Sequence, residues 1–273
     1  MTVSIDRLRA YFGFTKMPFS KELAPGMLHR SKAHAEAVAR LSWLIAERAL
    51  GVLTGEVGAG KTVAVRAATA ALDPSRHSVI YLFQPGTGVR GIYAEVVRAV
   101  GGQPCFQRSN LVPQAAELIE REEIERGRTV AVVADEAHLY SPDQLESLRL
   151  LGNARMDSHS PFALVLVGQP SLRRRLRLGS FSALDQRVGL RYHLDGMEPA
   201  ETADYVKHHL GLAGRADTLF SEDAVALIHQ TSRGLPRAVN NLAVAALVAA
   251  YAANKSIVDE SSARSAVTEV TAE

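Results

Sequence analysis

The stretch GVLTGEVGAGKT, residues 51–62, decides the fold. It begins as an apolar strand and runs into a glycine-rich loop that matches the pattern G-x-x-x-x-G-K-[ST] in full. The glycines let successive backbone N–H groups converge on a phosphate chain, and the helix that follows offers its N-terminus. A chance glycine-rich turn is the alternative, but this loop lies between a predicted strand and a predicted helix, which is the context that the motif requires.

Each position of this loop has an expected part in binding a nucleoside triphosphate. We expect Lys61 to reach the β- and γ-phosphates and Thr62 to hold Mg²⁺. The predicted ligands are therefore ATP and Mg²⁺. The predicted nucleotide-binding stretch comprises Gly55, Glu56, Val57, Gly58, Ala59, Gly60, Lys61, Thr62 and Val63.

Apolar runs alternate with helical patterns around this loop, which indicates a parallel sheet with helices on both faces. The predicted strands are 50–54, 78–83, 129–134, 162–167 and about 190–194. The predicted helices between them are 61–72, 89–100, 112–126, 143–152 and the arginine-rich 170–187. Further helices are predicted at 199–212, 221–232, 236–253 and near 260–269. We therefore expect an α/β P-loop domain with an N-terminal extension over residues 1–195 and a small helical lid domain over 196–273.

Two acidic residues, Asp135 and Glu136, follow the buried strand pattern of 129–134. A carboxylate at the C-terminal tip of a parallel strand faces the metal that Thr62 would hold, so Asp135 is a predicted metal ligand. Glu136 is then placed to orient and polarise an attacking water. Helix-capping acids are the alternative. Residues 135–138 spell DEAH, a motif of one class of helicases. Such helicases need two tandem ATPase lobes and this chain has room for one, so we do not favour a helicase and interpret His138 as a loop residue.

Composition narrows the class of protein. The chain has 273 residues, 47% of them hydrophobic, and 31 basic against 29 acidic side chains, for a formal net charge of +2. This net charge is too small to indicate that the whole surface attracts nucleic acid. Any surface that binds nucleic acid must therefore be a local basic patch. The single cysteine, Cys105, fits a reducing compartment. The N-terminus does not read as a signal peptide, and the apolar stretch 242–253 is too short for a membrane span, so we expect a soluble cytoplasmic protein with no membrane partner.

Taken together, the motifs resemble those of the AAA+ ATPases. Within that family the chain looks like the ExeA-like group and the transposition regulators of the TnsC, MuB and IstB type. The segments that carry this resemblance follow in the family's order: YFGFTKMPF, GVLTGEVGAGKT, VVADEAHLY, LVLVGQP, LDQRV and SRGLPRAVNNLA. The last three narrow the match beyond a P-loop ATPase.

The resemblance implies roles for three more residues. Gln169 stands where these ATPases carry the polar sensor of the γ-phosphate, with a strand-end amide as the alternative reading. Arg187 stands at the position of the arginine finger, which reaches into the neighbouring subunit's nucleotide; a surface arginine is the alternative. Arg237 in GLPR matches the second sensor, which closes the lid onto the nucleotide. Lys61, Glu136 and Arg187 are the predicted catalytic residues, and the protein is expected to form a homo-oligomer, as a ring or a helical filament.

The sequence is compatible with three functions for such an ATPase. The first is a transposition regulator that assembles on target DNA with ATP and activates a transposase encoded separately. The second is an ExeA-like secretion ATPase, whose better-known members carry a membrane segment and a peptidoglycan-binding module that this sequence does not show. The third is a nucleotide-dependent switch in a signalling or defence assembly.

A basic stretch, SLRRRLRLGS at 171–180, favours DNA. At helical spacing Arg173 and Arg174 each share a face with Arg177, so the three arginines are predicted to contact the phosphates of double-stranded DNA. No sequence-reading motif accompanies them, which indicates binding that is indifferent to base sequence. A solvated helix face or a patch between subunits is the alternative.

Overall fold

The computed structural model describes residues 4–20, 22–153 and 160–271. The chain divides into two compact units. The sheet unit comprises 34–57 and 61–194, and the helical unit comprises the chain up to Ala33, Gly58–Gly60 and the chain from Asp195 onward. The chain passes from the sheet unit to the helical unit at Asp195. The N-terminal segment, which the prediction included in the α/β domain as an extension, groups with the helical unit. Its Phe12, Phe14 and Phe19 are buried in that unit's hydrophobic core.

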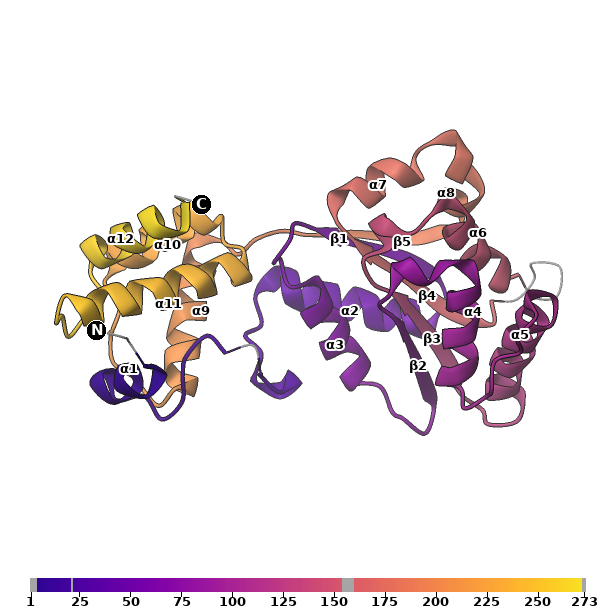
Figure 1. Cartoon of the computed structure of the whole chain (residues 1–273), viewed down its shortest axis with the longest axis horizontal. Helices are drawn as coiled ribbons and strands as arrows, with labels where there is room; N and C mark the ends of the chain where they lie inside the picture. Colours follow the sequence, from indigo (N-terminus) through magenta and orange to yellow (C-terminus); the bar gives the residue numbers. More distant parts are fainter. Residues whose placement is uncertain (1–3, 21, 154–159, 272–273) are drawn as a thin grey trace. The chain divides into compact units, whose positions relative to one another are not determined.

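The sheet unit holds five parallel strands in the order β2-β3-β4-β1-β5 (Figure 1). Their bounds are β1 (Leu50–Gly55), β2 (His77–Leu82), β3 (Thr129–Ala134), β4 (Phe162–Gly168) and β5 (Val188–Leu194). The helices of this unit are α2 (Lys32–Ala46), α3 (Lys61–Ala70), α4 (Gly88–Ala99), α5 (Arg108–Ile124), α6 (Pro142–Leu151), α7 (Pro170–Leu176) and α8 (Ser182–Arg187). The predicted α/β fold class is confirmed.

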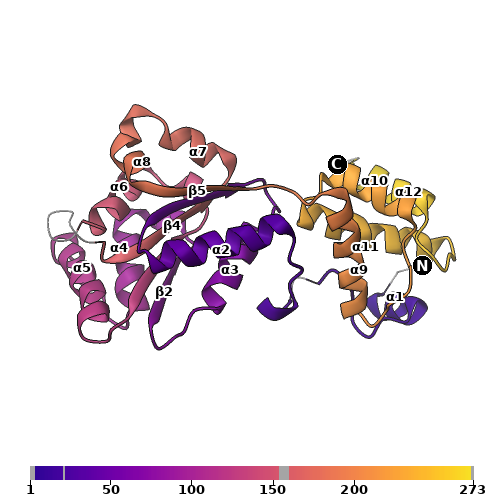
Figure 2. The ribbon, with the colours of Figure 1, turned by 180° about the vertical axis from the view of Figure 1, so that it is seen from behind.

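Helices cover both faces of the sheet because its central strands are apolar on both sides. Every residue of β4 is buried. On one face α2 and α3 lie together (Figure 2), and α2 approaches β1 so closely that a Cβ added to Gly51 would lie 1.8 Å from Leu44 Cδ1. On the other face one core cluster joins Val132 and Leu164 to residues of α4, α5 and α6. The order places β4 between β3 and β1, so the ends of these three strands meet at one edge.

The helical unit contains α1 (Ile5–Phe12), α9 (Pro199–Leu212), α10 (Glu222–Ser232), α11 (Pro236–Ala252) and α12 (Glu260–Thr271). Two boundary signals behave as their chemistry predicts. Pro199 occupies the first turn of α9, and the Ser221 hydroxyl accepts a hydrogen bond from the Ala224 N–H to cap α10. Within the described residues, no helix combines the length and the hydropathy that a bilayer span needs.

Candidate nucleotide site

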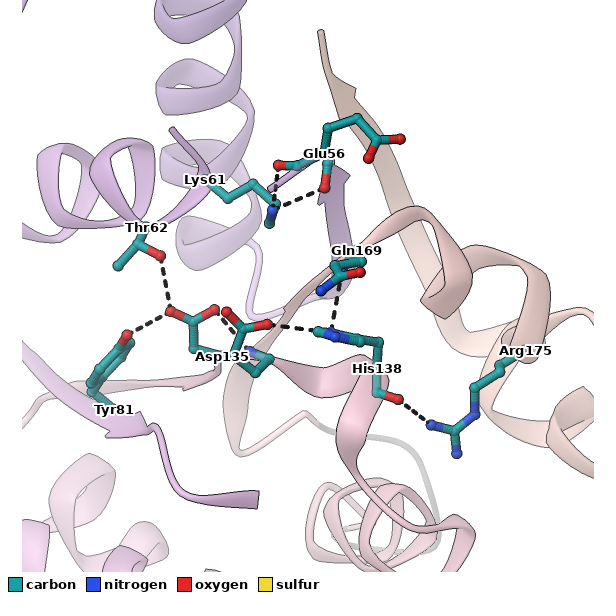
Figure 3. A network of polar contacts seen from close by, with 10 residues as sticks. Glu56, Lys61, Thr62, Tyr81, Asp135, His138, Gln169 and Arg175 are labelled. Carbon is teal, nitrogen blue, oxygen red and sulfur yellow. Dashed lines mark hydrogen bonds and ion pairs between the residues drawn. The ribbon is translucent and has the colours of Figure 1, made fainter. Parts of the chain in front are cut away.

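The phosphate loop joins β1 to α3. Gly58 and Gly60 have φ values of +84° and +96°, a left-handed conformation that glycine adopts without a steric penalty. Lys61, the first residue of α3, is only 8% exposed. Its Nζ donates to the carbonyl oxygens of Gly55 and Glu56, both at 2.9 Å (Figure 3). Two carbonyl oxygens therefore hold the ammonium group over the loop. Phosphate oxygens of a bound nucleotide could accept the same hydrogen bonds in their place.

Asp135 lies directly beyond the end of β3 and is 6% exposed. The Thr62 hydroxyl donates to its Oδ2 at 3.1 Å, and the Glu136 N–H donates to its Oδ1 at 2.8 Å. The structure thus brings together the two residues that the sequence predicts as metal ligands. Mg²⁺ prefers oxygen ligands and is commonly held by one or two protein groups together with substrate phosphates, and this pair fits that preference. The described residues contain no cluster of three or more His, Cys, Asp or Glu side chains suited to a metal.

Tyr81 is a member of the site that the sequence reasoning missed. Its hydroxyl donates to Asp135 Oδ2 at 2.6 Å (Figure 3), the same oxygen that accepts from Thr62. Burial, followed by the hydrogen bond to Asp135, raises the pKa of Tyr81, so the phenol remains a donor. The alternation in 79–83 could have placed Tyr81 on the exposed side of its strand. Its position beside Asp135 also depends on β2 and β3 being neighbours in the sheet.

Glu136 differs from Asp135 in backbone and exposure. Its φ of 50° and ψ of 35° are left-handed, which is uncommon for a residue with a Cβ and costs about 1–2 kcal/mol. Its side chain is 50% exposed, and its Oε2 lies 3.4 Å from His138 Nδ1. Backbone strain of this kind is concentrated at functional sites. Glu136 therefore presents a half-exposed carboxylate at the end of β3, and a carboxylate is one of the groups that can act as a base toward water.

Gln169 and His138 meet beside this carboxylate. Gln169 follows β4 and is the N-cap residue of α7, and its N–H donates to His138 Nδ1 at 3.4 Å (Figure 3). His138 is only 8% exposed, so the sequence interpretation of a simple loop residue missed its contacts. Arg175 was also missed. Its Nη1 donates to the His138 carbonyl at 2.7 Å and its Nη2 donates to the Tyr140 carbonyl at 2.8 Å.

Arg187 and the three arginines expected to contact DNA belong to the sheet unit. Arg187 ends α8, where its Nη1 donates to the Arg149 carbonyl at 3.4 Å and also contacts Asn153 Oδ1. Within one chain this guanidinium is thus bound at the end of α6. The three arginines expected to contact DNA are exposed on α7 and its C-cap: Arg173, Arg174 and Arg177.

Arg237 lies in the helical unit, where it is exposed as the second residue of α11. The turn before it depends on Gly234, whose φ is +68° and whose added Cβ would lie 2.0 Å from the Met197 carbonyl oxygen. The Met197 N–H donates to the Gly234 carbonyl at 2.9 Å. The GLPR segment therefore fixes the start of α11 and the place of Arg237.

Comparison with known proteins agrees with this geometry. Residues 45–176 match the family model described as an AAA domain. The structure is similar to the crystal structure of Cdc6p from Pyrobaculum aerophilum, with a TM-score of 0.68 at 18% identity, covering 88% of this chain and 67% of that one. The fold is that of an AAA+ P-loop NTPase. The AAA+ fold that the resemblance implied is thereby confirmed.

Two further proteins are similar to this chain. The structure of the Aeropyrum pernix ORC1 protein in complex with DNA is similar to this one, with a TM-score of 0.64 at 15% identity. The matched region covers 89% of this chain and 67% of the ORC1 chain. General secretion pathway protein A of Aeromonas hydrophila is 32% identical over 246 residues, which is 89% of this chain. The chain spans 44% of that protein's length.

Proposed function

We propose that this AAA+ chain hydrolyses ATP with Mg²⁺. The observation that supports the proposal is that the start of α3 and the end of β3 bring four residues together: Lys61 and Thr62 from α3, and Asp135 and Glu136 from directly after β3. Lys61 binds the β- and γ-phosphates, and Thr62 with Asp135 would hold the metal, which neutralises phosphate charge when bound.

In this proposal Glu136 orients and polarises the attacking water, and Gln169 contacts the γ-phosphate at the next strand end. The loop glycines present their N–H groups to the phosphates, and Arg237 closes the lid onto the bound nucleotide. The test is phosphate release from ATP by the purified chain with Mg²⁺ and with a chelator. Release that depends on Mg²⁺ is expected, and its absence under both conditions contradicts the proposal.

Hydrolysis is proposed to need a second copy of the chain. Arg187 would leave its contacts at the end of α6 and stabilise transition-state charge at the neighbouring subunit's nucleotide, a role worth about 10³–10⁵ in rate in related chemistry. Arg187→Ala should then bind ATP and hydrolyse it poorly. Mixing it with Glu136→Gln should restore part of the activity, because some interfaces then hold one intact glutamate and one intact finger. Normal assembly without restored activity would assign the finger to another arginine.

We also propose that ATP-bound copies assemble on double-stranded DNA, as a ring or a filament. The exposure of Arg173, Arg174 and Arg177 supports this, because one copy offers weak, salt-screened contacts while an oligomer repeats them along the duplex. Replacing the three with alanine should abolish ATP-dependent filter binding of duplex DNA. The matched control removes three exposed arginines elsewhere on the sheet unit, Arg76, Arg98 and Arg121, and should bind as the parent does. Tight binding without nucleotide contradicts the proposal.

The proposed work of this assembly is regulation of a separately encoded transposase. The first test is whether a transposase is encoded beside the gene for this chain, and the second is DNA joining by such a transposase with and without this chain and ATP. Stimulation that requires the three arginines of α7 is the expected result. A second candidate, a secretion-pathway ATPase, is favoured by the 32% identity to General secretion pathway protein A. Parent protein that hydrolyses ATP and binds no DNA under any nucleotide condition would favour this second candidate.

A further inference from the structure

His138 lies between the two residues to which the proposed function gives the chemistry of the γ-phosphate. Its Nδ1 is 3.4 Å from Glu136 Oε2 and 3.4 Å from the Gln169 N (Figure 3). Both distances are at the long end of hydrogen bonding. The ring is nearly buried, so these two groups, and not bulk water, are its partners on this side.

A single ring nitrogen cannot serve both partners at once. To accept from the Gln169 N–H, Nδ1 must carry its lone pair, and to donate to the Glu136 carboxylate, it must carry the proton. A neutral imidazole has one N–H, and exchange with solvent moves that proton between Nδ1 and Nε2 without changing the charge of the ring. The position of one proton therefore decides whether Glu136 is bonded to His138 or released.

The backbone around His138 is held firmly, which gives the ring little freedom to choose a third partner. The Arg175 guanidinium donates to two carbonyls of this turn, those of His138 and Tyr140, and lies 5.5 Å from the centre of the Phe181 ring. Arg175 belongs to α7, the helix that Gln169 caps, so the two residues that contact His138 from this side, Arg175 and Gln169, belong to one element.

We propose that His138 is a positioning residue for Glu136, which it holds through Nδ1 and releases when the Gln169 N–H takes that nitrogen. This inference rests on the proposed hydrolysis of ATP. His138 acts through Glu136 and is not given a contact with the nucleotide.

Three substitutions of His138 separate this role from packing. Asparagine puts an amide near the place of Nδ1, glutamine puts one near the place of Nε2, and leucine fills the space without a polar group. His138→Leu should lower kcat about 10- to 100-fold, because a misplaced catalytic group has that cost, with KM for ATP within about twofold of the parent. His138→Gln should behave like His138→Leu. His138→Asn should keep kcat within about threefold of the parent.

Thermal unfolding of each variant gives the folded fraction, and Arg175→Lys is the second probe. Lysine keeps the charge but lacks the fork that reaches two carbonyls, so kcat should fall several-fold with KM unchanged. The inference is overturned if His138→Leu keeps the parent's kcat, or if His138→Asn and His138→Leu fall equally. Parent protein without any turnover refutes the hydrolytic function itself, whereas active parent with unaffected variants refutes only the role of His138.

Discussion

Two neighbouring carboxylates at the end of β3 are held in opposite ways. Asp135 is 6% exposed and accepts three hydrogen bonds, from Thr62, Tyr81 and the Glu136 N–H, at 2.6–3.1 Å. Glu136 is 50% exposed, and its Oε2 lies 3.4 Å from His138 Nδ1. We name Lys61, Thr62, Tyr81 and Asp135 the binding cluster, and Glu136, His138 and Gln169 the release cluster. The groups proposed to bind phosphate and metal gain from being fixed beforehand. The proposed release of Glu136 by His138 instead needs a carboxylate that is held by few partners.

The largest effect on the binding cluster is expected from Lys61→Ala. The substitution removes a buried cation opposite the phosphates, and hydrogen bonds to charged groups are each worth about 1.5–3 kcal/mol, so ATP affinity should fall about 100-fold. Titration calorimetry or a fluorescent ATP analogue measures this. Lys61→Arg, which keeps the charge, is the control and should lose less. Unchanged affinity in Lys61→Ala would remove Lys61 from the binding cluster.

A smaller effect is expected from Tyr81→Phe. Without the phenol, Asp135 keeps its bonds to Thr62 and to the backbone but is oriented less firmly, so the Mg²⁺ concentration for half-maximal ATPase activity should rise about three- to tenfold. Val79→Thr changes a residue on the same exposed side of β2 and should leave that concentration unchanged. An equal Mg²⁺ requirement in Tyr81→Phe and the parent would reduce Tyr81 to a surface contact.

The difference between the clusters also explains what the sequence could predict. The glycine spacing, the lysine and the DE pair are short local motifs that follow directly from the chemistry of phosphate and metal, so Lys61, Thr62 and Asp135 could be placed together from the amino-acid sequence alone. The predicted strands and most of the predicted helices follow from apolar periodicity and agree with the structure to within a few residues. The predicted helix 170–187 is instead divided into α7 and α8. The described helices α1 and α2 were not predicted, and the grouping of the N-terminal segment with the helical unit depends on long-range packing of Phe12, Phe14 and Phe19.

The contacts of the release cluster could not be read from the sequence. His138 meets Gln169 across 31 positions, and Arg175 reaches His138 across 37, through the register of β3 and β4 and the start of α7. Arg175 stands in a run of arginines, RRR at 173–175, in which no local feature distinguishes the half-buried member from its exposed neighbours. Tyr81 likewise depends on which strand is adjacent to β3, and that order is a property of the whole sheet.

The smallest effect is on stability. Glu136 occupies a left-handed backbone that glycine adopts without steric penalty, so Glu136→Gly should raise the free energy of unfolding by about 0.5–1 kcal/mol, after allowance for glycine's greater freedom in the unfolded chain. Glu136→Gln keeps the strain and should unfold as the parent does. Urea denaturation of the three proteins measures the difference. A glycine variant less stable than the parent would mean that the backbone at Glu136 is not strained.

The central claim is that binding and hydrolysis belong to adjacent but separate residues at the end of β3. Glu136→Gln tests it most directly, with ATP affinity and phosphate release measured on the same preparation. The amide cannot polarise water as a carboxylate does, so turnover should fall about 10²–10⁴-fold, the usual contribution of a general base, while the affinity for ATP stays within about threefold of the parent. Hydrolysis at the parent rate, or a loss of ATP binding as large as the loss of turnover, would contradict the account.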